Sequence, residues 1–66
     1  MRVTLNGEER ELEPGLDLAG LLRGLGLNPH KVAVERNLAI VPRSLYSATA
    51  LAEGDKIEIV HFIGGG

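Results

Sequence analysis

Hydrophobic and polar residues alternate over the first five positions of the chain, a pattern typical of a half-buried β-strand. Positions 1, 3 and 5 are apolar, and an arginine and a threonine lie between them. Asn6-Gly7 follows, and this dipeptide tolerates positive φ at both central positions of a tight turn. The pattern therefore predicts a type I′ hairpin that leads into a second strand over residues 8–12.

A helix is predicted after the break at Pro14-Gly15, because four leucines follow at helical spacing. The intervals i, i+3, i+4 and i+7 place them on one stripe that faces a core: Leu18, Leu21, Leu22 and Leu25. Asp17 is well placed as the N-cap, since its carboxylate can accept from the free N–H groups of the first turn. Gly26 is expected to end the helix in a left-handed conformation.

Two further strands are predicted next. Alternation over residues 31–35 (KVAVE) indicates a third strand, and Arg36-Asn37 indicates a short turn into a fourth strand over residues 38–41. Pro42 ends that strand because proline cannot donate to a sheet ladder. Residues 43–52 are expected to form a single helical turn with Leu45 and Leu51 directed inward.

The last strand is predicted over residues 56–62 (KIEIVHF), with Ile57 and Ile59 inward. The alternation breaks after Ile59. Continuing the phase directs His61 inward and leaves Val60 and Phe62 on the solvent side. Exposed apolar side chains are typical of an interaction site, so we expect these two residues, together with Ile63, to dock a partner.

The order of elements predicts an α+β fold. One main helix of eight or nine residues is about 12 Å long and covers only one face of a four- to five-stranded mixed sheet. We expect a roll with the helix packed across the sheet, as in β-grasp (ubiquitin-like) domains. The domain is predicted over residues 1–62, followed by a flexible glycine-rich tail over residues 63–66.

Composition narrows the function classes. The 66 residues include no cysteine, so disulfides, thiolate metal sites and a cysteine nucleophile are excluded. The net charge is -2 and the seven basic residues are scattered, which argues against nucleic acid as a ligand. No stretch approaches the roughly 20 apolar residues that span a bilayer, so we expect a cytoplasmic protein that does not enter membranes.

The side chains offer no recognisable catalytic set. His30 and His61 are isolated and lack the spacing of a zinc site. Ser44 and Ser47 have no neighbouring base. Each remaining carboxylate is explained as a cap, a turn residue or a solvent-facing strand position: Asp17, Glu35, Glu53, Asp55 and Glu58. A chain this small is also expected to lack the pocket of several hundred cubic ångströms that small-molecule sites use, so an enzyme is not predicted.

One reactive group remains in the 66-residue chain, the α-carboxylate of Gly66. It is ionised at neutral pH, since its ordinary pKa is about 3.3–3.7, and an ionised carboxylate must be activated before a nucleophile can attack it. Three extended residues reach at most roughly 10 Å. Because glycine has no Cβ, Gly64 and Gly65 would let the terminal carbon enter a narrow pocket of a partner enzyme.

Over nearly its whole length the chain resembles the ThiS-type sulfur carriers of thiamine biosynthesis. The likeness rests on the order and spacing of five short motifs: LNG at 5–7, VERN at 34–37, IVPR at 40–43, GDKIEIV at 54–60 and the final GGG. Gly65 and Gly66 match the terminal pair of that family. Ile63 departs from it, because valine is common at this position.

The resemblance implies a specific cycle. An E1-like adenylating enzyme of the ThiF type uses ATP to activate Gly66, and a cysteine-derived sulfur donor system converts it to a thiocarboxylate. A thiazole synthase of the ThiG type then takes the sulfur, while the carrier itself binds no cofactor. Three alternatives stay open at this point: a molybdopterin-type sulfur carrier, a ubiquitin-like protein modifier and a non-covalent interaction module.

Overall fold

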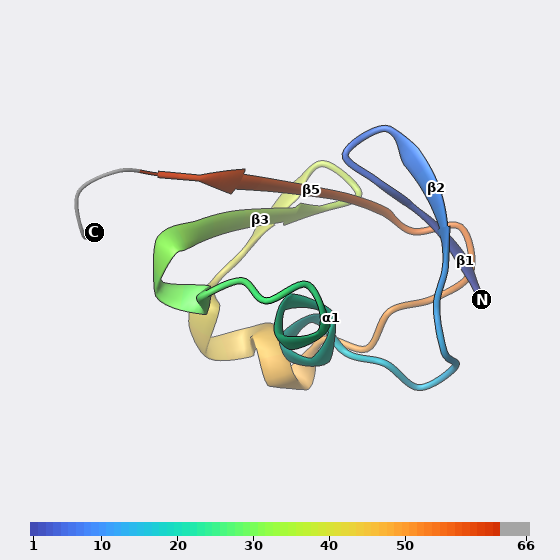
Figure 1. Cartoon of the computed structure of the whole chain (residues 1–66), viewed down its shortest axis with the longest axis horizontal. Helices are drawn as coiled ribbons and strands as arrows, with labels where there is room; N and C mark the ends of the chain where they lie inside the picture. Colours follow the sequence, from blue (N-terminus) through green and yellow to red (C-terminus); the bar gives the residue numbers. More distant parts are fainter. Residues whose placement is uncertain (63–66) are drawn as a thin grey trace.

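A computed structural model describes residues 1–62 of the chain as one sheet with a helix on one face (Figure 1). In chain order the elements are β1 (Arg2–Leu5), β2 (Glu8–Glu11), α1 (Leu18–Gly24), the 3-10 helix η1 (Pro29–Lys31), β3 (Val32–Arg36), β4 (Ala39–Val41), the 3-10 helix η2 (Arg43–Ala48) and β5 (Lys56–His61). The predicted α+β roll is confirmed. The predicted tail, residues 63–66, lies outside the described residues.

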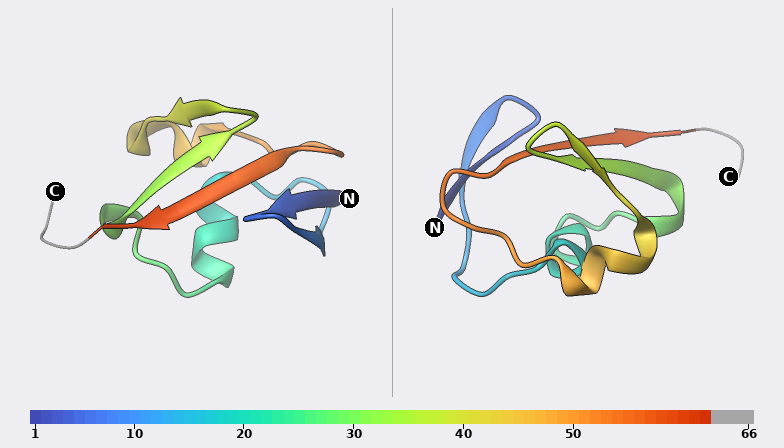
Figure 2. Two further views of the ribbon diagram at one scale, coloured as in Figure 1. Left: turned by 90° about the horizontal axis from the view of Figure 1, so that it is seen from above. Right: turned by 180° about the vertical axis from the view of Figure 1, so that it is seen from behind.

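The sheet is mixed and has five strands in the order β2-β1-β5-β3-β4 (Figure 2). β5 lies at its centre, parallel to β1 and antiparallel to β3. The hairpins β1-β2 and β3-β4 flank it on the two sides. β5 is therefore paired with β1 at its start, at Lys56 and Ile57, and with β3 as far as His61.

Two asparagines in the hairpin turns fasten β5 from opposite sides. The Asn6 side chain accepts from the Ile59 N–H at 2.7 Å and donates to the Ile59 carbonyl at 3.1 Å. The Asn37 side chain accepts from the Lys56 N–H at 2.9 Å. Both residues have positive φ, 49° and 53°, a conformation that asparagine tolerates better than most residues. The two turns thus fix the position of the central strand.

The core lies between the sheet and α1. Its most deeply buried side chains are Val3, Leu18, Leu22, Val34 and Ile57. Leu21 is buried as predicted, whereas Leu25 caps the helix and is only half-buried. Within residues 1–62, no helix is long and apolar enough to cross a membrane.

Both ends of α1 follow the predicted signals. The Asp17 carboxylate accepts from the Gly20 N–H at 2.7 Å, and Gly26 has a φ of +73°. The structure also explains Gly20, because a Cβ there would lie 2.8 Å from Cδ1 of Leu16. Glycine lets Leu16 pack closely over the first turn. A Cβ at Gly24 would meet nothing within 4 Å.

Two sequence predictions about the segment after β3 are wrong. The turn residues with positive φ are Asn37 and Leu38 (φ 53° and 71°), one position later than predicted, so β4 begins at Ala39. Leu45 is exposed, although Leu51 is buried as predicted. The reason is that η2 has three residues per turn, and Tyr46 occupies the core-facing position on it.

Asp55 is buried, whereas the sequence suggested only a turn residue. Its carboxylate accepts from Nε of Arg36 at 2.9 Å, Nδ2 of Asn37 at 3.0 Å and the Ala52 N–H at 2.8 Å. Burial by itself would raise the pKa of Asp55, but these hydrogen bonds and the Arg36 charge outweigh it and hold the pKa below its usual value. Asp55 therefore ties the β3-β4 turn to the start of β5.

Candidate functional site

An exposed apolar face lies on the side of the sheet opposite α1. Val60 is 64% exposed and Phe62 is 39% exposed, so the predicted outward orientation of both is confirmed. Ile40 on β4 is also exposed. It lies on the same face, because its neighbour Val41 pairs with the buried Val34 and adjacent residues of a strand point to opposite sides. We call Ile40, Val60 and Phe62 the apolar face.

Sequence reasoning missed Ile40. The strand Ala39–Val41 contains three apolar residues in a row, so its short pattern has no alternation that separates an inner from an outer side. The pairing with β3 supplies that information, since only the register shows that Ile40 lies opposite Glu35.

Leu38, directly before β4, is a further exposed apolar residue near Ile40. It is 81% exposed at the tip of the β3-β4 turn, where its φ is 71°. The left-handed region costs an ordinary L-residue about 1–2 kcal/mol, and glycine or asparagine normally occupies this turn position. Within residues 1–62, no packing explains a leucine at this position.

β5 leads directly from the centre of the sheet to the terminal glycines. Its last sheet pair joins His61 to Val32, and the Phe62 N–H then donates to the Lys31 carbonyl at 3.1 Å. The chain is thus held by backbone hydrogen bonds as far as Phe62 (Figure 1). The other predicted site residues, Ile63, Gly64, Gly65 and Gly66, lie outside the described residues.

The two histidines lie at different places on the surface. His61 continues the inward phase of β5, as predicted, but it is exposed at the rim of a shallow groove that Leu5 and Ile59 also line. His30 lies in η1 and is exposed. Within residues 1–62, no group of three histidine or carboxylate side chains could hold a metal ion.

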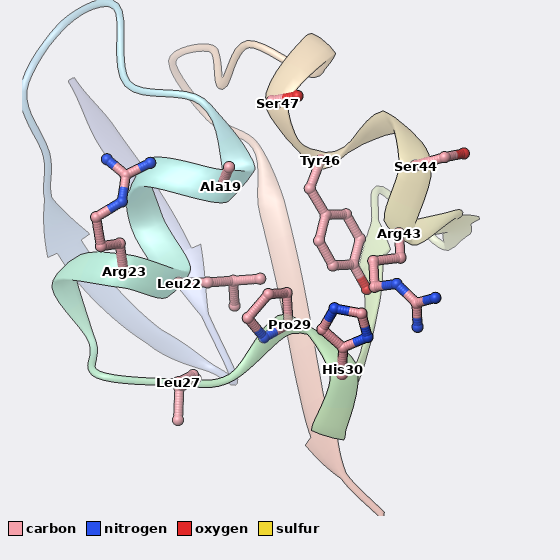
Figure 3. A pocket seen from close by; sticks show the side chains of 10 residues that line it. All are labelled: Ala19, Leu22, Arg23, Leu27, Pro29, His30, Arg43, Ser44, Tyr46 and Ser47. Carbon is pink, nitrogen blue, oxygen red and sulfur yellow. The ribbon is translucent and has the colours of Figure 1, made fainter. Parts of the chain in front are cut away.

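A larger groove separates α1 from η2 (Figure 3). Its volume is about 410 Å³, so the prediction that the chain lacks a pocket of several hundred cubic ångströms is wrong. The groove is open rather than enclosed, because the polar residues that line it are exposed: Arg23, His30, Arg43, Ser44 and Ser47. No local sequence pattern indicates this groove, since its two walls come from segments about twenty residues apart.

Known proteins resemble this chain over its full length. The ThiS family model matches residues 3–66. The crystal structure of a thiamine biosynthesis protein, ThiS, from Geobacter metallireducens superposes with a TM-score of 0.86 at 32% identity and covers all of both chains. The sulfur carrier protein ThiS of Bacillus subtilis is 46% identical over 46 residues, which is 70% of each chain.

Two longer relatives are also similar. The thiazole synthases of Magnetococcus marinus and Paramagnetospirillum magneticum are 59% and 53% identical to all 66 residues. The chain spans only 20% of the length of these two relatives. The family match and the shared fold together carry the conclusion that this chain belongs to the ThiS family.

Proposed function

We propose that the chain is a sulfur carrier of thiamine biosynthesis that bears sulfur as a thiocarboxylate on Gly66. It acts in the cytoplasm as a protein co-substrate and not as a catalyst. An E1-like adenylating enzyme binds the ATP, and the carrier binds no cofactor of its own. The observation that carries the proposal is the family match, which continues through residue 66 and so includes the terminal glycines.

The chemistry requires two steps at one carboxyl group. A carboxylate oxygen of Gly66 attacks the α-phosphate of ATP and pyrophosphate leaves, which gives an acyl adenylate. Cysteine-derived sulfur at the sulfide level then attacks the carbonyl carbon, and AMP leaves with one of the former carboxylate oxygens, which gives the thiocarboxylate. Adenylation is needed because an ionised carboxylate resists nucleophilic attack, whereas AMP is a good leaving group. Thiazole synthase is the acceptor of the sulfur.

The fold supports this division of labour between a body and a tail. β5 pairs with β3 as far as His61, and Asn6 and Asn37 hold it at Ile59 and Lys56, so the body presents the tail from a fixed point. Gly64 and Gly65 supply the narrow segment that enters the partner's active site. Val60, Phe62 and Ile63 dock the body, because large apolar side chains close to the start of the tail bury readily against a partner.

The two longer relatives favour thiazole synthase, and not a molybdopterin enzyme, as the acceptor of the sulfur. Two proteins named thiazole synthase contain a stretch that is more than half identical to this chain. A carrier of the molybdopterin type or a protein modifier would share the fold and the Gly-Gly end, but the relatives described above carry the names ThiS and thiazole synthase.

Adenylation at Gly66 can be tested with the purified 66-residue chain, an E1-like adenylating enzyme and ATP. We expect pyrophosphate release and an adenylated chain by intact-mass spectrometry. Deletion of Gly66 or amidation of its carboxylate should abolish both signals and leave the thermal unfolding midpoint unchanged. Pyrophosphate release that persists with the amidated chain would refute loading at this carboxylate.

A further inference from the structure

The groove between α1 and η2 has no part in the proposed sulfur transfer, yet it is built like a binding site. Its apolar wall comes from α1, the segment before η1 and the first residue of η1, with Leu22, Leu27 and Pro29. Polar groups line the opposite side from η1 and η2 (Figure 3). A few polar groups beside an apolar wall are what ligand sites in proteins have in common.

Tyr46 is the central group of this groove. The residue is only 4% exposed, but its side chain still lines the groove. Within residues 1–62 its hydroxyl makes no hydrogen bond. Every fully buried side-chain polar atom in that range has a partner, so the Tyr46 hydroxyl must be accessible to solvent. Figure 3 shows the ring entering from η2 with its hydroxyl end toward the side of Arg43 and His30. The Tyr46 hydroxyl is thus free to donate a hydrogen bond to a ligand in the groove.

The charges around the hydroxyl select the ligand. Burial raises the pKa of Tyr46, although the nearby Arg43 charge opposes that shift, so the hydroxyl stays protonated and can donate at neutral pH. Arg43 and Arg23 both line the groove, and among residues 1–62 no carboxylate does. The acidic side chains are concentrated elsewhere, on β2, where three of four residues are glutamates. The groove is therefore suited to bind an anion, although the net charge of the chain as a whole is -2.

The depth of the groove favours a side chain of a protein over a free small molecule. Small-molecule sites bury roughly 70–90% of their ligand, whereas His30, Arg43 and both serines of this groove are exposed. A free anion here would keep much of its surface in water. A carboxylate side chain on a partner is different, because the partner's own body covers the open side and excludes water.

The groove also lies at the end of the domain where the tail departs. His30 on its rim precedes Lys31, whose carbonyl holds Phe62. A protein that takes the tail into its active site must therefore cover this end of the body. In two relatives a stretch like this chain belongs to a thiazole synthase five times its length.

We propose that the groove receives a carboxylate side chain of thiazole synthase, which the Tyr46 hydroxyl and the Arg43 guanidinium bind. An apolar neighbour of that carboxylate packs over Leu27 and Pro29. This contact rests on the proposed function, because it takes thiazole synthase as the acceptor of the sulfur. It is separate from the apolar face, which lies on the other side of the sheet.

The test measures the dissociation constant between the 66-residue chain and purified thiazole synthase by calorimetry. Tyr46→Phe removes one donor and should weaken binding about fivefold, and Arg43→Gln should weaken it about tenfold or more because its partner is charged. Lys56→Gln is the matched control, because it also removes one positive charge, from an exposed residue at the end of β5 farthest from the tail. Binding by this variant should stay within twofold of the unsubstituted chain. Unchanged thermal midpoints exclude misfolding.

The outcomes separate this contact from the proposed function. Equal affinity of all four chains would overturn the groove contact while leaving sulfur carriage intact. No binding by the unsubstituted chain would also overturn it, and the adenylation of Gly66, measured separately, would then decide the proposed function. If inorganic phosphate shifts the amide resonances of the groove at micromolar concentration and the variants still bind thiazole synthase normally, the groove is a small-anion site and the proposal is wrong.

Discussion

Leu38 offers a sharp test of how the β3-β4 turn is built. It is the only leucine among the described residues with positive φ. At most positions alanine is more stable than glycine, because glycine loses more conformational freedom on folding. At Leu38 we expect the opposite order: the Leu38→Gly variant should be more stable than the Leu38→Ala variant.

The magnitude follows from the geometry. Both substitutions remove the side chain beyond Cβ; the residue is 81% exposed, so this part contributes only about 0.5 kcal/mol of burial. Leu38→Ala keeps the left-handed strain of about 1–2 kcal/mol, whereas Leu38→Gly relieves it. The greater freedom of glycine in the unfolded chain offsets about 0.4–1 kcal/mol of that relief. The glycine variant should therefore be about 0.5–1 kcal/mol more stable than the alanine variant.

Thermal unfolding followed by circular dichroism at neutral pH measures this difference. A free-energy difference of this size should raise the midpoint of Leu38→Gly about 3–6 °C above that of Leu38→Ala. Leu38→Asn is a useful third variant, since asparagine also tolerates the left-handed region, and it should resemble the glycine variant. An alanine variant that is as stable as the glycine variant, or more stable, would show that the positive φ of Leu38 carries no strain.

Three further predictions concern the helix, the buried carboxylate and the apolar face. Gly24→Ala should raise the free energy of unfolding by about 0.5–1 kcal/mol, because the new Cβ meets nothing within 4 Å. Gly20→Ala should raise it clearly less, because the new Cβ would lie 2.8 Å from a methyl group of Leu16. Equal increases for both variants in urea unfolding would contradict this prediction. Asp55 has a folded pKa below its ordinary 3.8, so the stability it contributes is present above that pH and is lost as the pH falls through the lower folded pKa. Asp55→Asn should cost about 1–3 kcal/mol at pH 7 and flatten the loss of stability below pH 4, and an unchanged acid slope would argue against the network. Phe62→Ala should weaken binding to the adenylating enzyme by a larger free energy than it weakens folding, since the side chain is 39% exposed; comparable losses in calorimetry and thermal unfolding would count against docking through the apolar face.

Local signals in the sequence were sufficient for most of the fold. The leucine spacing placed α1, Asn6-Gly7 placed the first hairpin and the alternation over residues 56–59 placed the inward face of β5. The errors arose where a position depends on partners far away in the chain. Asn37 looked like the end of a turn, but its side chain pairs with the start of β5 and shifts the turn by one residue.

The candidate site divides in the same way. The exposure of Val60 and Phe62 could be read from the broken alternation, because strand phase is a local property. The exposure of Ile40, the burial of Asp55 and the groove at Tyr46 could not be predicted. Each depends on which strand or helix packs against the residue, and that information is tertiary.

Loading of sulfur on Gly66 can be observed on the chain itself. The 66-residue chain is incubated with an E1-like adenylating enzyme, ATP and a cysteine-derived sulfur source, and then fragmented in a mass spectrometer. We expect exchange of one oxygen for sulfur, located at Gly66 and dependent on ATP. An unchanged mass at Gly66, or sulfur found on any other residue, would contradict the account.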